Sequence, residues 1–165
     1  HKSDASLVAR VHSREEAAEA ARVIKERARQ VYPDASIQGV LISEDATTSQ
    51  TRELILGTTR DCDFGQIVSL GIGGISTELY ADIAFRAIPI RESDVYDMLY
   101  QLRGRAIFGP FRGKNCVNLT ALTEVVIAFS NLLMEHQGII EGDVNPLLVD
   151  DSRTIVADAY LEVER

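Results

Sequence analysis

The sequence predicts an α+β fold in which a largely antiparallel sheet is backed by helices. Short apolar, β-prone segments occur in pairs separated by turn residues, which is typical of hairpins, and helical periodicity appears in separate stretches. Because strands and helices do not alternate regularly, the pattern disfavours a parallel βαβ arrangement. With 165 residues, of which 45% are hydrophobic, the chain is one ordinary domain or part of a larger one, and it is long enough for a core.

One helix and four strands are expected in the first half of the chain. Ser13, followed three residues later by Glu16, forms a capping box that opens an Ala-rich amphipathic helix. The helix runs to Val31, and Pro33 ends it. The strands expected around and after it are residues 6–12, 37–43, 54–59 and 66–70.

The second half is predicted to hold two helices between a strand and a C-terminal hairpin. Pro89 closes the strand, and Asn118 is a candidate cap for the second helix. The expected strand is residues 83–88, the helices are 92–102 and 119–135, and the hairpin strands are 143–149 and 154–161.

The C-terminal hairpin predicts a metal site. If Asp151 and Ser152 form the turn centre, Asn145 lies directly opposite Asp158. Opposed residues of an antiparallel pair share a face, with Cβ atoms about 5 Å apart, so an amide oxygen and a carboxylate converge. Such hard oxygen ligands suit Mg²⁺. The alternative is local: an Asn before Pro often ends a strand, and an Asp near a hairpin is often only solvated.

Composition excludes several function classes. A net charge of −8 disfavours nucleic acid and anionic membranes as partners. No apolar run approaches 20 residues and no signal peptide is visible, so we expect a cytoplasmic protein without a membrane span. The two distant cysteines, Cys62 and Cys116, form no CxxC pattern and are expected to be ordinary reduced thiols.

A basic cluster interrupts this acidic chain. Arg103, Arg105, Arg112 and Lys114 lie in a Gly-rich stretch, and Arg86 precedes them. Guanidinium groups on loops match phosphate geometry, so the cluster is a candidate anion site. The alternative is a solvated loop with scattered charges.

Several separated motifs carry a family resemblance when they are taken together in order. The chain resembles the ATP-grasp portion of the ADP-forming acyl-CoA synthetases, and within them the β subunit of the archaeal ADP-forming acetyl-CoA synthetase. The resemblance implies that residues 1–165 form a single ATP-grasp fragment, the larger C-terminal subdomain, without the smaller subdomain that clamps nucleotide. The motifs are residues 1–5, 53–57, 60–61 with 64–65, 71–75 with Glu78, 85–86 before Pro89, 102–104, 112–113 and 143–148.

The resemblance implies an enzyme that interconverts acyl-CoA, ADP and phosphate with a free acid, CoA and ATP through an acyl phosphate and a phosphohistidine. Asn145 and Asp158 are implied to hold Mg²⁺ on the nucleotide phosphates, with Asp143 as a third or water-mediated ligand. His1 matches the phosphoryl-relay histidine; a neutral imidazole is a suitable nucleophile near pH 7. The alternative for this first residue is an expression-tag remnant.

Further residues receive roles by the same resemblance. Arg86 is expected to assist catalysis by contacting the migrating phosphate, and Arg112 is expected to bind the nucleotide, as are Glu53 and Glu78. Simpler interpretations exist for the two glutamates, as a strand-edge residue and a helix-cap residue.

The resemblance also implies a CoA-binding α-type subunit as partner, and therefore a hetero-oligomer. Two functions of other classes remain open: a non-catalytic regulatory ATP-grasp domain of a protein acetyltransferase, and a scaffold for a CoA-binding partner.

Overall fold

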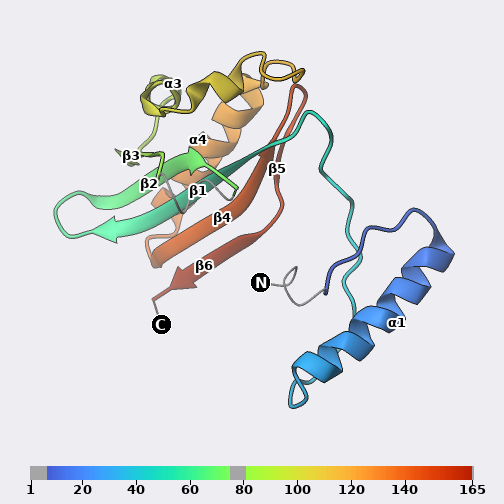
Figure 1. The fold of residues 1–165 in the computed structure, drawn as a ribbon. Coiled ribbons are helices and arrows are strands. Elements are labelled where there is room, and N and C mark those ends of the chain that lie inside the picture. The colour runs from blue at the N-terminus through green and yellow to red at the C-terminus, as the bar shows by residue number, and fades with distance from the viewer. Residues whose placement is uncertain (1–6, 75–80, 165) are drawn as a thin grey trace. The chain divides into compact units, whose positions relative to one another are not determined.

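A computed structural model describes residues 7–74 and 81–164 (Figure 1). The chain separates into two compact units, residues 1–45 and residues 46–165, and each is described by itself. The single ATP-grasp subdomain expected over residues 1–165 stays a prediction. In the part of the chain that the structure describes, no helix has the length and apolar character needed to cross a bilayer.

The first unit contains helix α1 (Arg14–Val31), which begins and ends where the sequence predicts. Ser13 Oγ accepts the Glu16 N–H at 3.1 Å, which is the first half of the capping box. Glu16 Oε2 accepts the N–H of His12, the residue before the cap, at 2.8 Å, rather than that of Ser13. At the other end the Tyr32 N–H makes the last helical bond, to Ala28 O. Pro33 cannot donate the next one.

The two strands predicted on either side of α1 are wrong. Residues 7–12 and 37–43 have no regular secondary structure. A strand exists only when a neighbouring backbone pairs with it, and the described residues supply no hydrogen-bond partner to residues 37–43. Two of the apolar side chains of residues 37–43 are well exposed: Leu41 is 90% and Ile42 71% accessible.

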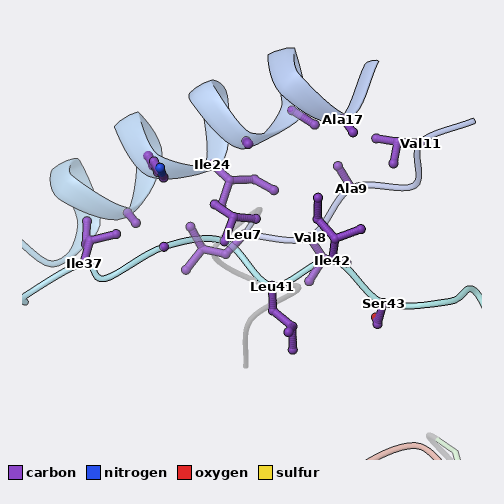
Figure 2. A pocket seen from close by; sticks show the side chains of 16 residues that line it. Leu7, Val8, Ala9, Val11, Ala17, Ile24, Ile37, Leu41, Ile42 and Ser43 are labelled. Atoms are coloured by element: carbon purple, nitrogen blue, oxygen red, sulfur yellow. The ribbon is translucent and has the colours of Figure 1, made fainter. Parts of the chain in front are cut away.

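The apolar side of α1 faces a hollow rather than a closed core. Figure 2 shows this hollow, of about 530 Å³, with Leu7 and Ile24 beside each other and Leu41 directed away from the helix. Among the described residues of this unit none is buried. The unit therefore has amphipathic patterning but little packing to hold it.

The second unit is built on a six-stranded antiparallel sheet with the order β3-β2-β1-β4-β5, in which β6 also pairs with β4. The strands lie next to their sequence neighbours where short turns connect them, as in the β1–β2 hairpin. The strands are β1 (Arg52–Asp61), β2 (Gly65–Ile72), β3 (Ile83–Ala87), β4 (Ile139–Val149), β5 (Thr154–Val156) and β6 (Ala159–Val163).

Helices of this unit cover one face of the sheet, as Figure 1 shows. The other face, called the open face below, carries no described helix of this unit. Leu54 and Leu56 of β1 are fully buried, whereas the intervening Ile55 is only half-buried, because alternate residues point to opposite faces. The covering elements are α3 (Glu92–Gln101), the short 3₁₀ helix η1 (Arg105–Phe108) and α4 (Leu119–Glu135). They share one apolar core with the sheet, which confirms the predicted α+β class.

The C-terminal hairpin has the predicted register. Leu147 opposes Val156 and Val144 opposes Ala159, which are the pairs that a turn centred on Asp151 and Ser152 requires. The second arm, predicted as one strand over 154–161, is divided into β5 and β6 by a break at residues 157–158. The first arm, β4, is longer than predicted.

Candidate metal and nucleotide site

Asn145 and Asp158 lie opposite each other at the break between β5 and β6. The Asn145 N–H donates to Asp158 O at 3.1 Å, and the Ala157 N–H donates to Pro146 O at 3.1 Å, so the backbones remain paired there. Both side chains are exposed and, by register, share the face that the helices leave open. The structure therefore places the two predicted residues opposite each other, as the sequence predicts.

A β-bulge in β4 shapes this position. Leu54 pairs with Leu147 but Leu56 pairs with Val144, so Asn145 and Pro146 together oppose the single residue Ile55 of β1. Proline has no N–H to give to the ladder, and a bulge is a place where a strand tolerates it. The Asn145–Pro146 peptide bond is cis.

Acidic side chains surround the Asn145–Asp158 pair on the open face. Asp143 lies two residues before Asn145 on the same face and opposes Tyr160, and Glu141 opposes Glu162. Among the described residues, neither Asp143 nor Asp158 forms an ion pair with a basic side chain. Concentrated negative charge without a protein counter-ion raises the local affinity for a cation. The donor set, two carboxylates and an amide oxygen, fits Mg²⁺.

Glu53 lies near the start of β1, on the open face of the sheet, and contacts the glycine-rich segment, residues 71–74. The Gly73 N–H donates to Glu53 O at 2.8 Å. A Cβ on Gly73 would lie 2.9 Å from the Glu53 carbonyl carbon and oxygen, so only glycine fits this approach. A Cβ on Gly74 would lie 3.8 Å from Glu53 Oε2, which places the carboxylate against this segment. The glycine-rich segment, one of the family motifs, thus packs against a predicted site residue.

Arg112 lies at the tip of a small hairpin. Phe111 and Lys114 exchange backbone hydrogen bonds of 3.1 and 3.0 Å, and the two residues between them have positive φ, +49° at Arg112 and +79° at Gly113. Two consecutive positive φ angles define the tight turns preferred in two-residue hairpins. The exposed Arg112 guanidinium lies 5.5 Å from the centre of the Phe111 ring.

Arg86 does not join this group. It pairs with Val68, whose side chain is buried on the helix-covered face, so Arg86 lies on the face opposite to Asn145. Its Nη1 donates to Phe85 O at 2.8 Å and to Gln101 Oε1 of α3 at 3.4 Å. The catalytic role of Arg86 stays a prediction, without support from its position. His1 and Glu78 lie outside the described residues.

Sequence reasoning missed two residues that organise the loops around this site. Arg52 is 7% exposed and donates to the carbonyls of two distant loop residues, Gly109 and Asn115. Asp82 accepts the N–H groups of Arg103 and Gly104, both at 2.8 Å. A signal existed for Arg52, because it occupies a core-facing position of an alternating strand, where a charged residue is unusual.

Comparisons with known proteins place the chain in one group. The ATP-grasp domain family matches residues 1–163. The chain is 37% identical over 162 residues to the β subunit of ADP-forming acetate–CoA ligase I of Pyrococcus furiosus, covering 98% of this chain and 69% of that protein. It is 36% identical to the β subunit of ligase II of the same organism, with the same coverage.

Two solved structures from Ca. Korarchaeum cryptofilum are also similar, and both are dinucleotide-forming acetyl-coenzyme A synthetase 1. One is a complex with coenzyme A, Ca-AMPCP and HgCl⁺; its TM-score is 0.85 at 33% identity, covering 93% of this chain and 66% of that one. The other contains coenzyme A and Mg-AMPPCP, with a phosphohistidine segment pointing towards the nucleotide binding site; its TM-score is 0.85 at 30% identity, covering 99% and 71%. The chain thus spans about two thirds of the length of these proteins.

Proposed function

Because this chain belongs to the ATP-grasp domain family and, within it, to the ADP-forming acyl-CoA ligases, we propose that it carries the nucleotide half-reaction of such a ligase. The complete reaction converts acyl-CoA, ADP and phosphate reversibly into a free acid, CoA and ATP. The family resemblance noted in the sequence is confirmed. The observation that carries the proposal is the pairing of Asn145 with Asp158 on the open acidic face of the sheet.

The cation is held by side-chain oxygens of the C-terminal hairpin. Asn145 contributes its amide oxygen and Asp158 its carboxylate, and Asp143 lies on the same face as a further ligand. When bound, Mg²⁺ neutralises charge on the nucleotide phosphates. The solved relative that contains Mg-AMPPCP supports this choice of metal. The exposed position of all three side chains leaves room for a nucleotide above the sheet.

Further residues handle the phosphoryl group and the nucleotide. Arg112 supplies a cation from its hairpin tip, and Glu53 contacts the nucleotide from the start of β1. His1 accepts and passes on the phosphoryl group, and Glu78 assists near the nucleotide. The phosphohistidine segment named in a solved relative supports the relay.

The activity also requires a CoA-binding partner. The curated relatives are named as β subunits, which supports a hetero-oligomer with an α-type subunit that recognises the acyl-CoA. The reaction takes place in the cytoplasm; Cys62 and Cys116 are both free thiols, as expected in a reducing compartment.

The test is ATP formation by the natural full-length protein assembled with its CoA-binding subunit. The complex is given acetyl-CoA, ADP and phosphate, with Mg²⁺ or with EDTA, and ATP is followed by a coupled assay. We expect ATP that depends on Mg²⁺. A complex that assembles but makes no ATP from any of several acyl-CoAs would contradict the proposal and favour a regulatory or scaffold function.

A further inference from the structure

Arg52, the first residue of β1, is a buried cation held by carbonyl groups. Its Nη1 donates to Gln50 O at 3.0 Å, and its Nη2 donates to Gly109 O at 3.0 Å and to Asn115 O at 2.5 Å. Among the described residues no carboxylate pairs with it, and its buried Nε has no partner. A buried charge that only carbonyl dipoles stabilise contributes little to the net stability of the fold. The contribution of Arg52 is instead to fix the position of the residues whose carbonyl groups it binds.

The segment that Arg52 binds is the hairpin that displays Arg112. Gly109 and Asn115 form the two ends of this segment, and one guanidinium nitrogen holds both. Lys114 adds a third attachment, because its Nζ donates to Thr51 O at 2.5 Å. The tip between these anchors contains a non-glycine residue with φ of +49°, a conformation that costs roughly 1 kcal/mol. Strain that the surroundings maintain often marks a functional position.

The same hairpin, through Asn115, and the cap of α4, through Asn118, are bonded to the turn that joins β4 and β5. Asn115 Nδ2 donates to Asp151 Oδ2 at 2.6 Å, and the Asn118 N–H donates to Asp150 O at 2.8 Å. Asn118 Nδ2 also donates to Ser152 O at 3.1 Å. This turn belongs to the hairpin that carries Asn145 and Asp158. Arg52 therefore stands at the junction of the strand start, the Arg112 hairpin and the candidate metal hairpin.

We propose that Arg52 is a positioning residue: it holds residues 109–115 so that the Arg112 guanidinium is presented to a phosphate group. The inference rests on the proposed function. Arg112 suits this role because it is exposed and, among the described residues, has only the Phe111 ring as a partner. A guanidinium binds phosphate oxygens in a bidentate manner, and this phosphate is either inorganic phosphate or that of ADP.

The chain offers a matched control at the other end of the same strand. Arg60 also donates to carbonyls of a distant loop, those of Gln137 and Ile139, and forms an ion pair of 3.7 Å with Glu164. That loop leads into the opposite end of β4 and carries none of the candidate site residues. Lysine at either position keeps the charge but loses the planar fork that reaches several carbonyls.

The experiment compares Arg52→Lys, Arg60→Lys, Arg112→Ala and the double variant Arg52→Lys/Arg112→Ala in the assembled full-length complex. KM for phosphate and for ADP are measured separately, which identifies the phosphate that Arg112 contacts. We expect Arg112→Ala to raise one KM on the order of tenfold or more, as loss of a charged hydrogen bond does. In the wild-type background, Arg52→Lys should raise the same KM about fivefold. In the Arg112→Ala background, Arg52→Lys should raise it less than about twofold, because the effects of coupled residues are not additive. Arg60→Lys should leave both KM values unchanged.

Equal effects of Arg52→Lys in both backgrounds, or equal effects of Arg52→Lys and Arg60→Lys, would overturn the inference. Amide exchange of residues 109–118 gives a readout that does not depend on turnover: it should accelerate in Arg52→Lys and not in Arg60→Lys. Unchanged exchange would show that Arg52 does not hold the hairpin. If the wild-type complex makes no ATP, the proposed function and the phosphate role fail together, and exchange alone decides the positioning role.

Discussion

The backbone N–H of Asn145 donates to the carbonyl oxygen of Asp158 at 3.1 Å, so the two predicted metal ligands are locked in register by their own main chains. Their side chains are both exposed on the open face of the sheet. A site built on paired strands keeps its ligands in place before a ligand arrives, which lowers the cost of binding.

Asp158→Ala should remove Mg²⁺-dependent ATP formation without unfolding the protein. The carboxylate is exposed and, among the described residues, accepts only the adjacent Ala159 N–H, so we expect the free energy of unfolding to change by less than about 0.5 kcal/mol. Residues that only orient a metal-binding side chain typically lower activity roughly 10- to 100-fold when they are mutated. Because Asp158 is proposed to bind the metal itself, turnover should fall by more than that. Asp97→Ala, which removes an exposed carboxylate of α3 outside the candidate site, is the control and should keep its activity. Unchanged turnover in Asp158→Ala would show that Asp158 is not a ligand of the metal ion.

Asp150 should make the stability of the fold sensitive to acid. Burial raises the pKa of this carboxyl, but the bonds that Oδ1 accepts from Ser152 Oγ (2.7 Å), Arg153 N (2.8 Å) and Ser152 N (2.8 Å), with the Arg153 charge, bring it below its ordinary value. A lowered pKa in the folded state means that the unfolded chain binds the proton more tightly. The stabilisation is therefore present above about pH 4 and is lost as the pH falls through the lower, folded pKa.

Asp150→Ala tests this sign. At pH 7 it should lower the free energy of unfolding by about 1–3 kcal/mol, since three hydrogen bonds to this charged carboxylate are lost. The difference in the free energy of unfolding between wild type and variant, measured by urea denaturation, should become smaller as the pH is lowered from 7 to 3. Asp97→Ala, at an exposed position of α3, should show no such convergence. A constant difference at every pH would show that the Asp150 charge is not the source of the effect.

Gly73→Ala should destabilise the glycine-rich segment against β1. The new Cβ would lie 2.9 Å from backbone atoms of Glu53, which cannot move aside as a flexible side chain could. Overpacking of this kind costs typically about 1–3 kcal/mol, measurable by thermal or urea unfolding. Gly138→Ala is the matched control, because its Cβ would meet nothing within 4 Å. Equal stability of the two variants would show that the contact with Glu53 does not constrain position 73.

Helix α1 should exchange its amide hydrogens much faster than β1 and β4. No described residue of its unit is buried, so local opening of the helix exposes little additional apolar surface. The centres of β1 and β4 lie over a closed core and should exchange only through large unfolding events. Hydrogen exchange followed by mass spectrometry measures both. Protection of α1 equal to that of β4 would mean that the first unit is held by contacts other than those described.

The sequence by itself predicts the elements whose determinants are local. The cap at Ser13 needs only a glutamate three residues later, and the pairing of Asn145 with Asp158 needs only a turn at Asp151 and the two-residue period of strands. The same local reasoning fails for residues 37–43, because their apolar pattern is that of a strand but a strand also requires a partner backbone.

Only the tertiary structure decides properties that depend on contacts between distant segments. The pairing of β2 with β3 puts Arg86 on the helix-covered face, away from Asn145, and no local pattern specifies that choice. The alternation of β1 could mark Arg52 as unusual, but only the fold shows that Gly109 and Asn115, 57 and 63 residues away, lie at its guanidinium. Local hydrogen bonding and periodicity determine which residues can pair within the hairpin. Burial and the register of the whole sheet determine which face and which loop each side chain serves.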